Sequence, residues 1–210
     1  MPQRIRFPPI APLTSTRKSK PPLVSARLAI RYLTPMQIVQ TLPTPRLTLR
    51  PFTPEDRPAM IALQGDPQVM RLYGNAEPLT ANQVALVLDA HIHCRDKYYW
   101  AWAVCLREDP ACFGQITAMP VEWNAHPWIE LCWLLMPGRW RRGYATEAVR
   151  AVIDHGIKDL AWRNLMANAD LRNLPSLRVM IKNNMLLAGD EKDAHGRTRR
   201  IYTRIIPPTA

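Results

Sequence analysis

One uninterrupted segment, from Glu130 to Ala148, constrains the fold of this chain more than any other. It begins as an apolar run suited to a central strand, turns through a basic stretch that contains Gly143, and continues with helical spacing. The N-terminus of a helix has free N–H groups and a partial positive charge, so a turn leading into it can bind an anion. We therefore expect a phosphate-binding loop at Arg139–Thr146, although the local pattern alone also fits an ordinary helix start.

The composition of this loop indicates a large phosphorylated ligand. Gly143 lacks a Cβ, so a phosphate can approach its backbone closely, and the small Ala145 adds little bulk. Arg139, Arg141 and Arg142 bring positive charge to the same turn. The ligand that these features favour is a pyrophosphate carried on a bulky cofactor.

The rest of the chain alternates between strand and helix patterns. Period-two or continuous apolar runs predict strands, and i, i+3, i+4 spacing predicts helices. The predicted strands are Arg46–Arg50, Tyr98–Leu106, Phe113–Val121, Trp128–Met136, Leu165–Ala169, Leu186–Ala188 and Arg200–Ile206, and the predicted helices are Thr53–Leu63, Thr80–Cys94, Tyr144–Leu160 and Leu174–Asn183. This order predicts an α/β (α+β) fold, with a mixed, mostly antiparallel sheet of six to seven strands and helices on both faces.

Charge and proline divide the chain into two parts. The net charge is +11, but residues 1–43 contain seven basic residues and no acidic one. We expect residues 1–43 to be a disordered, Pro-rich basic extension and residues 44–210 to form one domain. The extension fits a solvated tail, an arm that touches RNA, a targeting peptide, or an upstream start codon with Met36 as the true start.

The remaining composition limits the setting of the protein. No apolar run reaches the roughly 20 residues that a membrane span requires. The four cysteines are scattered, without CxxC spacing, and lie in apolar runs, so free buried thiols in a reducing compartment are expected. We expect a cytoplasmic protein with no membrane contact. His91 and His93 point to nearly opposite sides of their predicted helix, so no metal site is predicted.

Several segments together resemble the GNAT superfamily of N-acetyltransferases. The segment Trp133–Ala148 resembles the signature strand ending in Trp-Leu-x-Pro and followed by Gly-Tyr-Ala-Thr-Glu-Ala, and the Asn-x-x-Ser-x-Arg-Val-x-x-Lys stretch is matched at Asn173–Lys182. Arg46–Phe52, Asp66–Arg71 and Pro78–Thr80 are similar to the RimJ/RimL subfamily, which acetylates ribosomal-protein N-termini. The resemblance covers nearly all of residues 44–206.

The resemblance implies that acetyl-CoA is the co-substrate and assigns residues to it. The splayed strand would pair with the pantetheine arm, the loop would bind the pyrophosphate, and Asn173 would hydrogen-bond a pantetheine amide. The implied cofactor-binding residues are Leu134, Leu135, Met136, Arg141, Arg142, Gly143, Tyr144, Ala145, Thr146 and Asn173. Asn173 is equally well explained as a helix N-cap.

Two side chains are candidates for catalysis. Glu130 lies among apolar neighbours that would raise its pKa toward that of a general base, although a structural pairing with an arginine is as good an explanation. Ser176 resembles the family serine that protonates the leaving sulfur, and it also fits a first-turn helix serine. Glu122 is a weaker alternative base.

Departures from the family pattern leave more than one class of function open. Trp140, Asn184 and Met185 replace the usual residues, and Gly189–Thr198 is short and highly charged in a region that helps to form the acceptor site. The main hypothesis is acetyl transfer to a primary amine, either a protein N-terminus or a small molecule. The alternatives are a GNAT-fold protein that binds acetyl-CoA without efficient transfer, and an RNA-binding protein acting through its N-terminal extension. A homodimer is left open.

Overall fold

The computed structural model describes residues 39–93 and 99–207, and the expectations for residues 1–38 lie outside this part. It contains one eight-stranded sheet of order β1-β2-β3-β4-β5-β6-β8-β7. The strands are β1 Leu42–Pro43, β2 Leu47–Arg50, β3 Trp100–Leu106, β4 Asp109–Trp123, β5 His126–Leu135, β6 Asn164–Asp170, β7 Leu186–Lys192 and β8 Thr198–Ile205. All neighbours are antiparallel except β5 and β6, which confirms the mixed, mostly antiparallel sheet.

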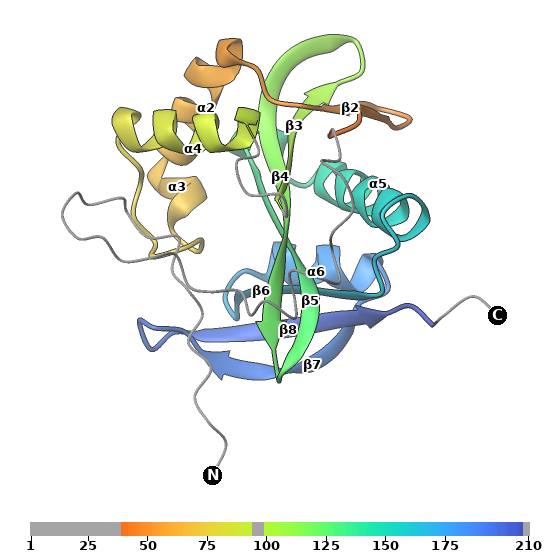
Figure 1. Cartoon of the computed structure of the whole chain (residues 1–210). Helices are drawn as coiled ribbons and strands as arrows, with labels where there is room; N and C mark the ends of the chain where they lie inside the picture. The colour runs from red at the N-terminus through yellow and green to blue at the C-terminus, as the bar shows by residue number, and fades with distance from the viewer. Residues whose placement is uncertain (1–38, 94–98, 208–210) are drawn as a thin grey trace.

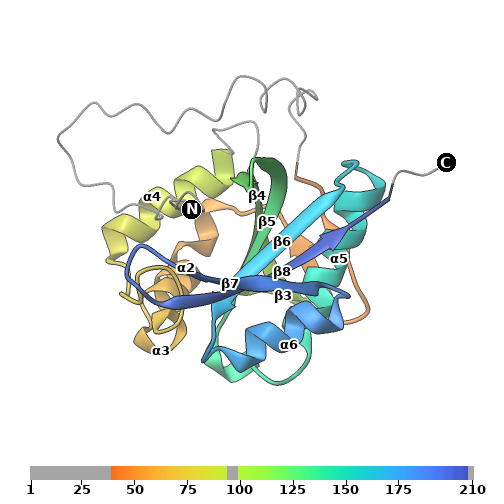
Figure 2. The same cartoon turned by 90° about the horizontal axis from the view of Figure 1, so that it is seen from below.

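Helices cover both faces of this sheet (Figures 1 and 2). They are α2 Arg57–Gln64, α3 Pro67–Met70, α4 Ala81–His93, α5 Tyr144–Lys158 and α6 Leu174–Lys182, with short 3-10 turns η1 Pro54–Asp56 and η2 Pro137–Arg139. One core includes Val149 and Val152 of α5 and Met180 of α6. A second core includes Met60 of α2 and Leu88 of α4. β3 is almost wholly buried because it lies between these two layers.

The predicted strand count of six to seven was wrong, because β1 was not foreseen. Leu42–Pro43 pairs with β2, and the Trp102 indole donates to the Gln40 carbonyl at 2.9 Å. These contacts attach residues that the sequence assigned to the N-terminal extension. A two-residue strand and the one-turn helix α3 carry no periodicity, so pattern alone does not detect them.

The sheet opens along one edge of β5, and this opening positions the functional site. β5 and β6 are paired only at Ile129 with Leu165 and at Glu130 with Met166. Beyond Glu130, β5 continues to Leu135 along β4, whereas β6 continues along β8. The predicted splay of this strand is therefore present, and beyond Glu130 one backbone edge of β5 has no partner strand within residues 39–93 and 99–207.

No helix among the described residues is long and apolar enough to cross a membrane.

Candidate functional site

The open edge of β5 begins at Glu130 and ends at the loop before α5. Met136 donates its N–H to the Phe113 carbonyl of β4 at 2.9 Å. Because backbone groups alternate in direction along a strand, Leu134 and Met136 turn toward β4, and Trp133 and Leu135 turn toward the opening. The Trp140 indole donates to the Leu135 carbonyl at 2.6 Å. Of the three residues predicted to meet the pantetheine arm, only Leu135 thus presents its backbone to the opening, and its carbonyl is already bonded.

The loop that follows has the geometry of an anion site. Gly143 is the N-cap of α5 with φ of +80°, and Arg141 also has a positive φ of +59°. The first intrahelical bond runs from the Glu147 N–H to the Gly143 carbonyl. Within the described ranges, the N–H groups of Tyr144, Ala145 and Thr146 have no acceptor, so they remain free to bind an anion.

A clamp formed by Arg46 and Glu147 holds this loop against β2. Glu147 accepts hydrogen bonds from Thr44 Oγ1 at 2.6 Å and from the Arg46 N–H at 2.9 Å, and its other oxygen accepts from Arg46 Nε at 2.7 Å. Arg46 Nη1 also donates to the Arg142 carbonyl at 2.9 Å. Burial pushes the pKa of Glu147 upward, but these hydrogen bonds hold the pKa below its usual range. In the sequence, Arg46 and Glu147 stand out only as parts of the family pattern.

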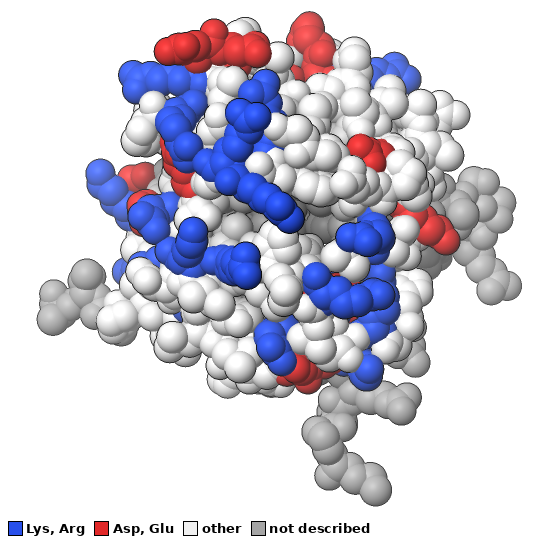
Figure 3. Space-filling view, turned by 180° about the vertical axis from the view of Figure 1, so that it is seen from behind, with Lys and Arg blue, Asp and Glu red and all other residues white. Residues whose placement is uncertain are grey.

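Basic side chains surround the loop in different ways. The Arg46 guanidinium lies over the Tyr144 ring at 4.8 Å, and that of Arg139 lies over the Phe113 ring at 5.1 Å. Arg141 and Arg142 are exposed. Figure 3 shows Lys and Arg side chains gathered on the face opposite to that of Figure 1, where they outnumber acidic ones. This distribution favours an anionic ligand.

The N-terminus of α6 carries the two other residues that were predicted from the Asn-x-x-Ser pattern. Asn173 is the N-cap, and its side-chain oxygen accepts from the Ser176 N–H at 3.2 Å. Asn173 is therefore a helix N-cap. Its side-chain amide nitrogen is not used in this cap and can bind a ligand. Ser176 is partly buried, and its hydroxyl makes no hydrogen bond to the described protein atoms.

Glu130 lies where β5 leaves β6. Its carboxylate accepts a short hydrogen bond from the Asn168 side-chain amide of β6. Burial raises the pKa of Glu130 to about 7, and the nearby positive charge of Arg199 opposes this rise. A carboxyl with such a pKa exchanges protons readily near neutral pH, as a general base requires. Arg199 reaches Glu130 only through Asn168, so Glu130 forms no direct ion pair with it.

Further groups around Glu130 were not predicted. The Tyr73 side chain comes from the segment after α3, Cys132 lies two residues along β5, and burial raises the pKa of both. Electrostatic interactions connect the two side chains with Glu130 and Arg199. Only the sheet register and the packing of α3 bring these residues together, so no local motif marks them.

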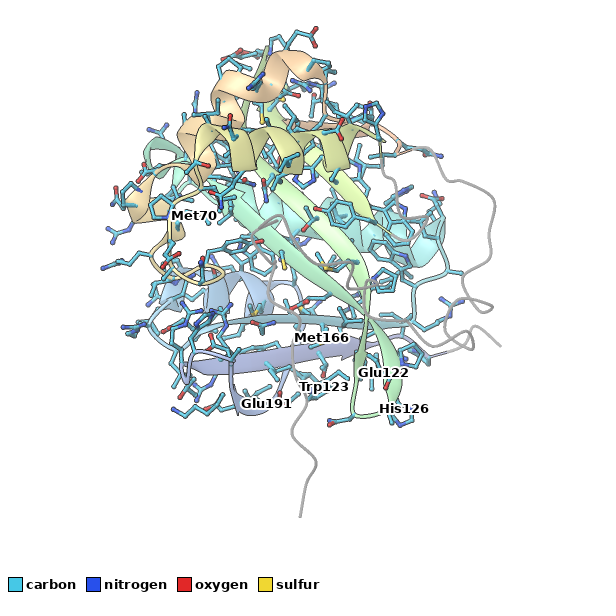
Figure 4. The ribbon with its side chains drawn as sticks, turned by 60° about the vertical axis from the view of Figure 1, so that its left-hand side comes forward. Met70, Glu122, Trp123, His126, Met166 and Glu191 are labelled. Carbon is cyan, nitrogen blue, oxygen red and sulfur yellow. The ribbon has the colours of Figure 1, made fainter. Side chains whose placement is uncertain are left out.

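The alternative base, Glu122, lies elsewhere. It is opposite Pro127 in the β4–β5 ladder, and alternation places it on the sheet face opposite to that of Trp123, Trp128 and Glu130. Its side chain is exposed near the hairpin tip (Figure 4). Glu122 is therefore not part of the Glu130 cluster. In the described part of the chain, no three His, Cys, Asp or Glu side chains form a metal-ligand group.

Comparison with known proteins agrees with this arrangement. The family model described as an acetyltransferase (GNAT) domain matches residues 46–186, which is more than half of the chain. An uncharacterized N-acetyltransferase of Bacillus subtilis, YnaD, is 27% identical over 146 residues, covering 70% of this chain and 82% of that protein.

Solved structures have the same fold. RimL, a ribosomal-protein alpha-N acetyltransferase in complex with coenzyme A, aligns with a TM-score of 0.68 at 16% identity, covering 80% of this chain and 98% of that one. Mycobacterium smegmatis RimJ in complex with a CoA disulfide aligns with a TM-score of 0.66 at 18% identity, covering 80% and 88%. The chain therefore belongs to the GNAT family of acetyltransferases.

Proposed function

We propose that this enzyme transfers the acetyl group of acetyl-CoA to a primary amine by direct attack on the thioester. The observation that carries the proposal is the opening between β5 and β6, which has a free anion-binding loop at one end and Glu130 at the other. A long ligand with phosphates at one end and a reactive thioester at the other suits this arrangement.

The binding roles follow from the groups that remain free. The N–H groups at Tyr144–Thr146, aided by Arg141 and Arg142, receive the pyrophosphate. The open edge of β5 at Trp133 and Leu135 offers backbone partners to the pantetheine amides. The Asn173 amide nitrogen, which is not used in capping α6, donates to the same arm.

The chemical step requires no covalent enzyme intermediate. Glu130 accepts a proton from the incoming ammonium, and the neutral amine nitrogen then attacks the thioester carbonyl carbon. A C–N bond forms and the C–S bond breaks. Ser176 donates its proton to the departing sulfur and receives the second proton from the nitrogen, so the products are an N-acetyl amine and CoA thiol, with the first proton on Glu130. Holding both substrates in one opening supplies much of the acceleration.

The printed names of RimL and RimJ favour a protein N-terminal α-amine among the acceptors, and a small-molecule amine is the other class. The test is CoA release from acetyl-CoA with a panel of peptides and small amines, with mass spectrometry of the acetylated product. Amine-dependent CoA release supports the proposal. Acetyl-CoA that binds at saturating concentration but transfers to no amine contradicts it.

The contact between Trp140 and the Leu135 carbonyl favours a second candidate, a protein that holds CoA without efficient transfer. The indole occupies a group on the open edge at 2.6 Å, and the Trp140 side chain is 39% exposed. On this account, Trp140→Gln frees the carbonyl and raises turnover. An unchanged or lower rate for Trp140→Gln argues against any inhibitory role of the indole.

A further inference from the structure

Arg199 of β8 lies beside the proposed general base on the same face of the sheet. It is opposite Asp170 of β6 on one side and Glu191 of β7 on the other. Its Nε donates to the Asn168 side-chain oxygen at 3.0 Å, while the Asn168 amide nitrogen donates to Glu130. A single amide side chain therefore separates a guanidinium from the carboxylate that would accept the amine proton.

The charge of Arg199 is not neutralised by a direct ion pair with a described residue. Asp170 is bound through both oxygens to Arg172 at 2.9 and 2.8 Å, and this contact lowers the pKa of Asp170 to about 2. Glu191 accepts from the Trp123 indole at 2.8 Å. Arg199 Nη1 is buried without a hydrogen-bond partner among the described residues. An unsatisfied charged donor is costly, so an anionic ligand group here is favoured.

The hairpin that carries Arg199 contacts neighbouring segments of the protein. Figure 4 shows Trp123 beside Glu191, below Met166, with Met70 at the other end of the region. Arg197, at the start of the same hairpin arm, is held by Asp193 and donates to the Gly74 carbonyl, which follows Tyr73. Arg197 Nη1 is also buried without a partner in the described ranges. The β7–β8 hairpin is thus tied to the segment that carries Tyr73.

The spacing between Glu130 and Arg199 suits a small ligand. The Glu130 carboxylate and Arg199 Nε are joined by two hydrogen bonds and one amide group, so they lie at most on the order of 7 Å apart. An α-amino acid has its amine and its carboxylate on one carbon, and with a hydrogen bond at each end it spans a comparable length. A peptide N-terminus presents a neutral carbonyl where the amino acid has its carboxylate, and this cannot neutralise Arg199.

We propose that the acceptor is a free α-amino carboxylate, with its amine at Glu130 and its carboxylate on Arg199. This inference rests on the proposed acetyl transfer and narrows its acceptor class. The planar guanidinium matches a carboxylate better than a lysine ammonium would, because it offers two parallel N–H groups. The product would be an N-acetyl amino acid.

The experiment compares each standard L-amino acid with its own C-terminal amide, using the full chain, acetyl-CoA and detection of released CoA. The two acceptors differ mainly in the carboxylate charge, so their kcat/KM ratio reports on Arg199. We expect the acid form of the preferred amino acid to exceed its amide by about tenfold to a hundredfold. Arg199→Met should abolish this ratio, because the acid and the amide would then meet the same uncharged side chain.

Arg200→Met is the matched control. Arg200 is the next residue of β8, points to the other face and pairs with Asp190 at 2.8 Å, so its loss should leave the ratio intact. If the native protein acetylates the amides with the same kcat/KM as the acids, the proposal is overturned, and this result does not depend on whether the variants fold. Acetylation of peptide N-termini alone also overturns it but leaves acetyl transfer standing. The absence of transfer to any amine overturns both proposals.

Discussion

The two ends of the opening between β5 and β6 are built in opposite ways. The cofactor half consists of the loop at Arg139–Thr146 and its clamp, and most of it comes from one continuous segment. The proposed acceptor half consists of Tyr73, Glu130, Asn168 and Arg199, which come from three strands and from the segment after α3. The loop presents backbone N–H groups, whereas the acceptor half presents side chains.

This difference explains why the sequence marks the cofactor half more clearly than the acceptor half. A backbone site needs a turn of fixed shape, and that shape requires a recognisable glycine and helix start. A side-chain site needs only that certain residues meet in space, so each of its members looks ordinary in the sequence. Substitutions can separate the two halves. Those in the loop and its clamp should affect cofactor binding, and those in the acceptor half should affect transfer.

The largest effect should come from Glu130→Gln. The variant keeps the shape of the side chain but cannot accept a proton, so kcat should fall by about 10²- to 10⁴-fold. In the native enzyme, kcat/KM should rise with pH through about 7 as Glu130 loses its proton. Glu122→Gln is the control, since Glu122 lies on the opposite face. Steady-state rates for both variants check this, and an equal loss in the two would contradict the assignment.

A smaller effect, confined to the cofactor, is expected for Arg46→Met. Without the guanidinium, the Arg142 carbonyl loses its partner and Glu147 keeps only its bonds from Thr44 and one backbone N–H, so the loop is held less firmly and KM for acetyl-CoA should rise about tenfold. The control is Arg50→Met. Arg50, the last residue of β2, makes a similar two-pronged pair with Asp56 at 2.8 Å but does not contact the loop. If both variants change KM equally, the clamp has no special role.

Gly143→Ala should distort the turn at the start of α5. The φ of +80° disfavours a Cβ by about 1 kcal/mol, and the added atom would lie 3.3 Å from Arg46 Nη2. We expect a lower unfolding midpoint and a several-fold weaker affinity for acetyl-CoA. Gly138→Ala provides the comparison, because nothing lies within 4 Å of its added atom. Similar losses for both would mean that the shape of the turn at Gly143 is unimportant.

The smallest effect concerns stability in the acceptor half. The pKa of Glu130 is about 7 in the folded state against an ordinary 4.5, so the folded protein holds a proton that the unfolded chain has lost within this range. The free energy of unfolding should therefore fall as pH rises from about 4.5 to about 7. Glu130→Gln should remove this part of the pH dependence. Denaturant midpoints across this pH range test it, and parallel curves would argue against a buried, protonated Glu130.

The sequence was sufficient for most of the fold and for the position of the loop that leads into α5. The strand and helix periods, Gly143 and the apolar spacing of α5 all lie within short windows. The sequence was insufficient for the clamp, because 101 positions separate Arg46 from Glu147 in the chain. It also missed β1, whose formation depends on pairing with β2.

The acceptor half was predicted only through Glu130. That residue was notable as an acidic side chain in an apolar strand. Asn168 and Arg199 lie in β6 and β8, and their convergence on Glu130 depends on the β5–β6 and β6–β8 registers. The highly charged Gly189–Thr198 segment departs from the family pattern. The structure places it in the β7–β8 hairpin, next to Arg199.

The most direct test applies the same chemical change to each half. Calorimetric titration of acetyl-CoA into the native protein, Glu147→Gln and Glu130→Gln measures three dissociation constants. The account predicts binding by the native protein, unchanged binding by Glu130→Gln and clearly weaker binding by Glu147→Gln, because only Glu147 supports the loop. Weaker binding by Glu130→Gln together with unchanged binding by Glu147→Gln would contradict the division of the site into two halves.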